Sequence, residues 1–109
     1  METKVFEHSR VMDFTGKVDY SPEGIVSKQV IQKEKGNITL FAFDKGQMLS
    51  EHTAPFDAMV QVIEGRAEIR IAGQPNELNA GESIIMPANV PHAVNAIEKF
   101  KMLLTMIRE

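Results

Sequence analysis

The chain has no cysteine, which excludes disulfide bonds, thiolate chemistry and any metal site built from cysteine ligands. It also lacks an apolar run long enough to span a bilayer, and its first residues carry charges where a signal peptide needs an apolar core. Lysine and arginine do not cluster into a patch of the kind that nucleic acid or a membrane surface requires. We therefore expect a cytoplasmic protein that binds neither nucleic acid nor membranes.

The composition is otherwise that of an ordinary globular protein. The 109 residues are 43% hydrophobic and 25% charged, with a formal net charge of −3. The chain contains no internal repeat and no low-complexity segment. Its length predicts a single domain, residues 1–109, and a domain of this size gains stability from oligomerisation.

Short runs of alternating apolar and polar residues follow one another along the chain, separated by turn residues. The clearest run is Arg66–Ala72, in which Ala67, Ile69 and Ile71 face one way and the charged residues face the other. Strands are expected at residues 25–33, 38–43, 58–64, 66–72, 83–86, 92–96 and 100–107, and turns at residues 20–24, 34–37, 44–46, 73–76 and 80–81. This pattern predicts an all-β sandwich or barrel.

The segment from Gly46 to Gly65 carries one histidine, His52, which follows Gly46 after five intervening residues. The two glycines suit the ends of strands, where positive φ or a close approach of the backbone is needed. By alternation, residues 52 and 54 lie on one face of a strand, so both side chains can point into a barrel. The segment therefore predicts a histidine in the barrel interior.

A second segment, residues 81–96, has a related pattern. Pro87 follows Gly81 after five residues and ends a strand, and His92 comes five positions after the proline. Fifteen residues separate the two segments. In order and spacing they resemble the two motifs of the cupin superfamily, in particular those of small single-domain microbial cupins. The resemblance implies a jelly-roll-type barrel, also called a double-stranded β-helix.

The resemblance also bears on metal binding. A typical cupin holds a metal with three histidines and one glutamate, and by position these ligands fall on His52, Ala54, Ala58 and His92. Alanine cannot ligate a metal, so the usual four-ligand site cannot form. The resemblance implies that a divalent transition metal, such as Fe, Mn, Ni or Zn, would be held by His52 and His92.

Asp57 is a candidate for a replacement ligand. It stands one position before the expected glutamate, and a bulge at Pro55 would turn its carboxylate inward. Two histidines and one carboxylate are the ligand set of many non-haem iron sites. The third histidine, His8, lies outside both motifs and is expected on the surface.

Three interpretations of the histidines stay open. In the first, they are the polar groups of an apolar pocket for a small organic ligand. In the second, they are the candidate catalytic residues of a metal-dependent enzyme, of the dioxygenase or the isomerase and epimerase class. In the third, they are remnants in a barrel without remaining activity. The pocket is expected to be lined by Met48, His52, Val60, Val62, Ile84, Met86 and His92.

The last expected strand has apolar residues on both faces. Leu103 and Ile107 alternate with Phe100 and Met102, so they would be exposed in an isolated barrel. Another sheet is therefore expected to pack there. Because cupins commonly pair through their sheets, we expect a homodimer.

Overall fold

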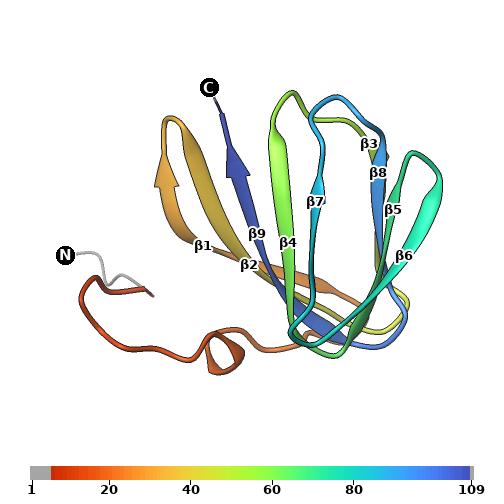
Figure 1. Cartoon of the computed structure of the whole chain (residues 1–109). Coiled ribbons are helices and arrows are strands. Elements are labelled where there is room, and N and C mark those ends of the chain that lie inside the picture. Colours follow the sequence, from red (N-terminus) through yellow and green to blue (C-terminus); the bar gives the residue numbers. More distant parts are fainter. Residues whose placement is uncertain (1–5, 109) are drawn as a thin grey trace.

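A computed structural model describes residues 6–108, and within this range the regular structure is almost entirely β (Figure 1). The strands are β1 (Ile25–Lys33), β2 (Gly36–Phe43), β3 (Met48–His52), β4 (Asp57–Glu64), β5 (Arg66–Ile71), β6 (Gln74–Asn79), β7 (Ser83–Met86), β8 (His92–Ala96) and β9 (Phe100–Ile107). One turn of 3-10 helix, Phe14–Gly16, precedes them, and Asp13 caps it by accepting a hydrogen bond from the Thr15 amide. The expected all-β class is confirmed.

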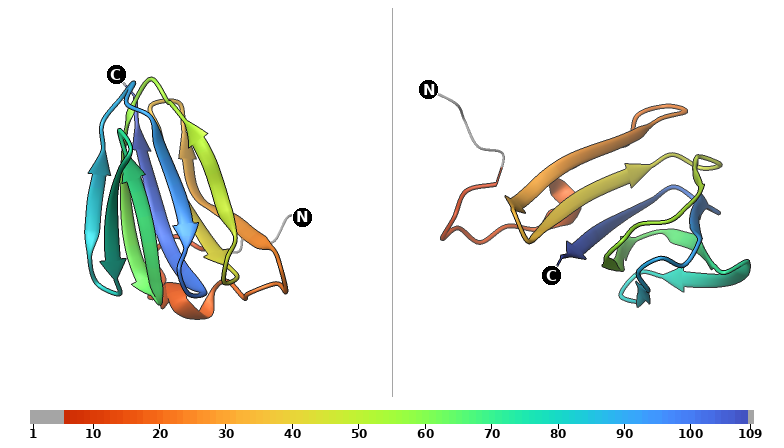
Figure 2. Two further views of the ribbon diagram at one scale, coloured as in Figure 1. Left: turned by 90° about the vertical axis from the view of Figure 1, so that its right-hand side faces the viewer. Right: turned by 90° about the horizontal axis from the view of Figure 1, so that it is seen from above.

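The strands form two antiparallel sheets. The larger sheet has the order β1-β2-β9-β4-β7, and the smaller has the order β3-β8-β5-β6. The two sheets are the walls of a barrel, which Figure 2 shows from the side of the smaller sheet and from above. Strands that are distant in the chain become neighbours, because β2 pairs with β9 and β3 pairs with β8. This arrangement confirms the jelly-roll-type barrel.

Strands β3 and β6 lie outside the ranges expected from the sequence. β6 begins at Gln74, inside a segment expected to be a turn, so that expectation was wrong. The turn is made instead by Ala72 and Gly73, whose φ angles are 51° and 79°. Positive φ at two successive residues is what a tight hairpin turn between twisted strands needs. Pro75 is tolerated within β6 because this strand is an edge of the smaller sheet.

The turn between β1 and β2 is also shorter than expected. It consists of Glu34 and Lys35, and Gly36 already belongs to β2. Gly36 does not have the positive φ for which a turn would use it. Instead, a Cβ atom at this position would lie 2.7 Å from the carbonyl oxygen of Met106 on β9. Glycine is therefore required by the close approach of the two strands.

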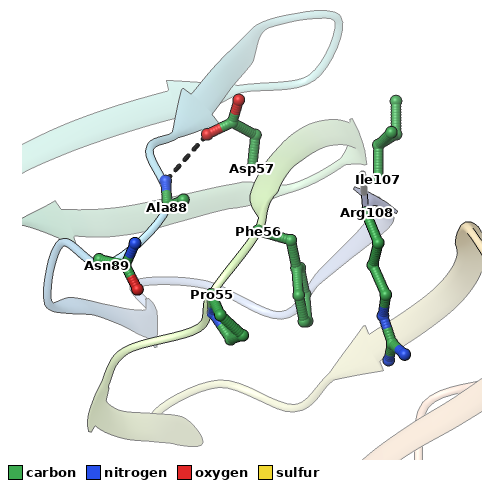
Figure 3. A pocket seen from close by; sticks show the side chains of 7 residues that line it. All are labelled: Pro55, Phe56, Asp57, Ala88, Asn89, Ile107 and Arg108. Atoms are coloured by element: carbon green, nitrogen blue, oxygen red, sulfur yellow. Dashed lines mark hydrogen bonds between the residues drawn. The ribbon is translucent and has the colours of Figure 1, made fainter.

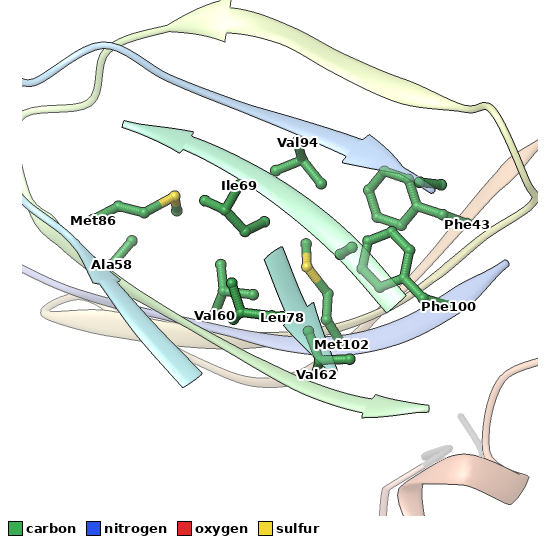
Figure 4. Close-up of a cluster of buried hydrophobic side chains, with 12 residues drawn as sticks. Phe43, Ala58, Val60, Val62, Ile69, Leu78, Met86, Val94, Phe100 and Met102 are labelled. Atoms are coloured by element: carbon green, nitrogen blue, oxygen red, sulfur yellow. The ribbon is translucent and has the colours of Figure 1, made fainter. Parts of the chain in front are cut away.

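The space between the sheets is filled by apolar side chains (Figure 4). Phe43 of β2 and Phe100 of β9 are register partners, and their rings stack with centroids 4.7 Å apart. The other buried members of this inner core are Ala58, Val60, Val62, Ala67, Ile69, Leu78, Met86, Val94, Ala96 and Met102. On each strand they occupy alternate positions, as the two-residue period of a strand requires.

A second apolar cluster lies on the outer face of the larger sheet. The N-terminal arm (residues 6–20), red and orange in Figure 1, contributes Phe6 and Val18, which pack with Leu40 and Ala42 of β2. Leu103 packs against the same cluster. Leu103 is thus half-buried within the chain itself, whereas Ile107 is 65% exposed, and the expectation that another sheet packs on this face stays a prediction.

Candidate functional site

His52 and His92 come together because β3 pairs with β8. His52 is the last residue of β3 and His92 is the first residue of β8, and the two are partners in the antiparallel register. Their positions differ by 40 in the sequence. The pairing of two distant strands therefore joins the two motif histidines at one end of the barrel. His92 is buried, but His52 is exposed, so the structure does not place the His52 side chain in the barrel interior as the motif predicts.

The two imidazole rings meet edge to face. Their centroids are 4.4 Å apart and the Nε2 atoms are separated by 3.2 Å. The Nδ1 atom of His52 lies 2.7 Å from the Ser50 carbonyl oxygen, and that of His92 lies 3.2 Å from the Val90 carbonyl oxygen. Because a carbonyl oxygen only accepts, each Nδ1 carries the hydrogen and donates it. In the neutral rings, both Nε2 lone pairs are then directed toward the space between the rings.

The surroundings favour the neutral form of His92. Its side chain is buried, and burial lowers the pKa of His92 below the ordinary value of 6.5. The hydrogen bond to the Val90 carbonyl raises this pKa, and the proximity of His52 lowers it. Two facing lone pairs repel each other, so the arrangement favours a ligand hydrogen-bond donor or a cation between the rings.

The donor set fits a metal in part. With metal–nitrogen bonds of about 2.0–2.1 Å, a nitrogen–nitrogen distance of 3.2 Å corresponds to an angle of about 100° at the metal. This angle lies between the octahedral and tetrahedral values. The carbonyl bond at each Nδ1 is also the usual support of a metal-binding histidine. Within residues 6–108, however, no group of three or more His, Cys, Asp or Glu side chains is placed to share a metal.

Asp57 does not join the histidine pair. It is the first residue of β4 and is exposed, and its Oδ1 accepts a hydrogen bond from the Ala88 amide at 2.9 Å. Alternation explains this placement, because Ala58 is buried against the inner core and its neighbour must face the other way. His8 is exposed in the N-terminal arm, as expected.

Several residues expected to line an internal pocket are core residues instead. Val60, Val62 and Met86 are only 0%, 1% and 3% exposed, and their side chains contact one another and the facing sheet (Figure 4). Ile84 is half-buried against the same core. Met48 is 60% exposed. The side chains that point inward from the two sheets fill the barrel, so they leave little surface for a ligand at these positions.

The loops beside the two histidines are tied to each other. The loop after β3 (residues 53–56) follows His52, and the loop before β8 (residues 87–91) precedes His92. The Asn89 amide donates to the Ala54 carbonyl at 2.7 Å. Asn89 stands where the cupin motif usually has a glycine, and its φ of 63° explains that preference. Asparagine adopts this left-handed conformation more readily than most residues.

A pocket with a volume of about 640 Å³ lies where these loops meet the end of β9 (Figure 3). Its lining consists of Pro55, Phe56, Asp57, Ala88, Asn89, Ile107 and Arg108. Sequence reasoning missed this pocket. The spacing of the two motifs predicts that the residues near His52 and His92 lie at one end of the barrel. Ile107 lies beside them only because β9 pairs with β4.

Two antiparallel sheets closed around an apolar core, with paired histidines at one end, define a small β-barrel protein of the jelly-roll type. The Cupin domain family matches residues 39–108, so the chain belongs to the cupin superfamily. This superfamily includes small-molecule-binding proteins and metal-dependent dioxygenases.

Solved structures extend the comparison. A conserved protein of unknown function from Streptococcus pyogenes is similar at 38% identity, with a TM-score of 0.92, over 97% of this chain and 93% of the other. A cupin 2 conserved barrel domain protein from Leptotrichia buccalis has 40% identity and a TM-score of 0.84, over 86% of this chain and 46% of the other. A cupin superfamily protein from Desulfitobacterium hafniense, at 23% identity and a TM-score of 0.90, covers all of both chains and shows the fold alone. Among curated proteins, no significant match was found.

Proposed function

We propose that this chain is a small-molecule-binding cupin whose ligand site lies at the end of the barrel that carries His52 and His92. One observation carries the proposal: the loops that flank the two histidines also border a pocket of about 640 Å³. Small-molecule sites typically have volumes of about 300–1,000 Å³ and combine apolar walls with a few polar groups.

The histidine pair gives such a site a hydrogen-bonding preference. Each Nδ1 is occupied by a backbone carbonyl, so the two Nε2 atoms remain as acceptors. A ligand hydroxyl or N–H group placed beside them would donate to an Nε2 atom and relieve the repulsion between the two lone pairs. The pair therefore selects a ligand that carries a hydrogen-bond donor.

A second candidate function is that of a metal-dependent enzyme of the dioxygenase or the isomerase and epimerase class. The Nε2 separation of 3.2 Å favours it, because this spacing suits two ligands of one metal ion. His52 and His92 would hold the ion, and water or substrate would complete its shell in place of Ala54 and Ala58. A divalent Fe, Mn, Ni or Zn ion would supply Lewis-acid or, for redox-active metals, oxygen chemistry.

Elemental analysis separates the two functions. The untagged protein is incubated with each divalent metal and desalted, and the metal content per chain is measured for the wild type, His52→Ala and His92→Ala. The matched control is His8→Ala, which removes the remaining histidine of the chain without touching the pair. We expect no stoichiometric metal in any of the four proteins. About one ion per chain, lost only in His52→Ala and His92→Ala, would replace the first function by the second.

The binding function has its own positive test. A collection of small organic compounds is screened for those that raise the unfolding temperature, as a ligand of the native state must. We expect the shift to be reduced in His52→Ala and His92→Ala and kept in His8→Ala. Shifts that survive in both pair variants would place the ligand elsewhere and contradict the proposed site.

Two further properties belong to the proposal. We propose that the protein acts in the cytoplasm and forms a homodimer, as is common for cupins. No helix among the described residues is long and apolar enough to cross a membrane. The support for a dimer is the outer edge of the larger sheet, where β1 is an edge strand among residues 6–108 and Ile31 is 42% exposed.

A further inference from the structure

The pocket between the loops that flank the histidine pair, which is lined by neither His52 nor His92, contains one arginine in an unusual setting. In residues 6–108, Arg10, Arg66 and Arg70 each pair with a glutamate. No carboxylate of the described residues forms such a pair with Arg108. The centre of the Arg108 guanidinium lies instead 5.2 Å from the centroid of the Phe56 ring.

Both residues are held in place by the surrounding backbone. The Arg108 amide donates to the Lys35 carbonyl at 2.6 Å, which fixes the end of β9 to the turn between β1 and β2. Phe56 immediately precedes β4, the neighbour of β9. In Figure 3 the side chains of Phe56 and Arg108 extend to the same side, whereas the Asp57 carboxylate turns away toward Ala88.

This geometry leaves part of the guanidinium available for a ligand. A guanidinium that lies over an aromatic ring still presents the N–H donors of its edge, and these match the two oxygens of a carboxylate. Phe56, Pro55 and Ile107 supply apolar surface next to the donors. The pocket thus joins one positive group to an apolar wall.

We propose that this pocket binds the carboxylate of a small organic acid, with Arg108 as the carboxylate-binding residue and Phe56 beside the apolar body of the acid. The inference rests on the proposed function and names the ligand class of the same end of the barrel. The Asp57 carboxylate also belongs to the lining, but it accepts a hydrogen bond from the Ala88 amide and turns away from Arg108, so it does not neutralise the guanidinium.

The test uses phenylacetate as the probe and phenylacetamide as its uncharged counterpart of nearly the same shape. Both are titrated at millimolar concentrations into the ¹⁵N-labelled full chain, and the amide signals of Ala88, Asn89 and Ile107 are followed by NMR. We expect saturable shifts with phenylacetate, and binding of phenylacetamide weaker by about tenfold or more, since a charge-assisted bond is lost.

Substitutions of Arg108 test whether its guanidinium contacts the carboxylate of the probe. Arg108→Gln is expected to weaken phenylacetate binding by about tenfold or more and to leave phenylacetamide binding nearly unchanged. Arg108→Lys, which keeps the charge but loses the planar fork, should fall between wild type and Arg108→Gln. The matched control is Arg70→Gln, because Arg70 is also exposed but pairs with Glu68 away from this pocket. The unfolding temperature verifies that each variant is folded.

The outcomes separate this inference from the proposed function. Equal binding of the two probes, wild-type affinity in Arg108→Gln, or no shift in the pocket amides would overturn the carboxylate site. If uncharged compounds then still bind in a manner that depends on His52 and His92, the proposed function stands without it. If phenylacetate binds through Arg108 but no donor-carrying compound binds in a manner that depends on His52 and His92, the carboxylate site stands and the role of the histidine pair fails.

Discussion

Tyr20 is the only tyrosine of the chain, which has no tryptophan, and it lies where the N-terminal arm meets the larger sheet. Its hydroxyl donates a hydrogen bond to the Glu64 carboxylate. The ammonium groups of Lys99 and Lys101 lie 5.0 Å and 4.9 Å from the centroid of its ring. A single side chain therefore combines a hydrogen bond to a carboxylate with two cation–π contacts.

From the surroundings of Tyr20 we predict how the stability of the protein changes at alkaline pH. Burial, followed by the hydrogen bond to Glu64, raises the pKa of Tyr20 above the ordinary value of 10.0. A raised pKa means that the contribution to stability is fully present below pH 10 and is lost as the pH rises toward the folded pKa. We expect the free energy of unfolding to fall above pH 10 in the wild type, and to fall less in Tyr20→Phe.

The titration can be observed directly, because no other residue of the chain contributes tyrosinate absorbance. In the folded protein, the ultraviolet signal of tyrosinate should appear at higher pH than in the protein unfolded by urea. Identical titration curves for the folded and unfolded protein would contradict the prediction.

At the scale of elements, β9 holds the N-terminal arm against the larger sheet through a buried lysine. Lys101 is 7% exposed and lies between the buried Phe100 and Met102, but its side chain points to the outer face. Its Nζ donates to the Thr15 carbonyl at 2.6 Å and lies 3.6 Å from the Glu64 carboxylate. One side chain of β9 thus satisfies a backbone carbonyl of the arm.

Replacing this lysine should loosen the arm before it affects the barrel. In Lys101→Met, the Thr15 carbonyl loses its partner, and we expect a loss of about 1–3 kcal/mol in the free energy of unfolding. Hydrogen exchange should accelerate at Gly16 and Lys17, whose amides bond within the arm. The control is Lys99→Met, since the Lys99 ammonium also lies over the Tyr20 ring but the residue is exposed. Equal effects of the two substitutions would show that the buried bond does not hold the arm.

At the scale of the whole molecule, the larger sheet of residues 6–108 ends in two edge strands. β1 and β7 are the edge strands, and they expose Ile31 and Ile85, at 42% and 62%. The N-terminal arm packs on the outer face of the larger sheet, against β1 and β2. The β1 edge is therefore the surface that we assign to the proposed homodimer.

Sedimentation equilibrium tests this assignment. We expect the wild type to have twice the mass of one chain, and Ile31→Glu to weaken the association by placing a charge at the interface. Ile85→Glu introduces the same charge at the opposite edge and should leave the mass unchanged. A wild type with the mass of a single chain would reject the homodimer, and an effect of Ile85→Glu alone would place the interface at β7.

Much of the barrel could be predicted because strand alternation and turn chemistry are local properties. The run at residues 66–72 became β5 within one residue of its expected end, with Ala67 and Ile69 buried. At β6 the local sequence is misleading, because Pro75 and Asn76 are residues typical of turns. They are tolerated in a strand here because β6 lies at the edge of the smaller sheet. Gly36 lies in a segment expected to be a turn but belongs to β2, because a glycine is required there by β9, a strand that follows about seventy residues later.

The class of fold and the spacing of the cupin motifs can be predicted from the amino-acid order alone, since both follow from periodicity and from residues a few positions apart. The three-dimensional arrangement was needed to show that His52 and His92 face each other through Nε2, that Val60 and Val62 are filled core positions, and that Arg108 lies over Phe56. These facts depend on which distant strands pair and how their side chains share space. The two-residue period of a strand predicts which side chains point inward. Whether these side chains fill the barrel or leave room for a ligand depends on how the two sheets pack.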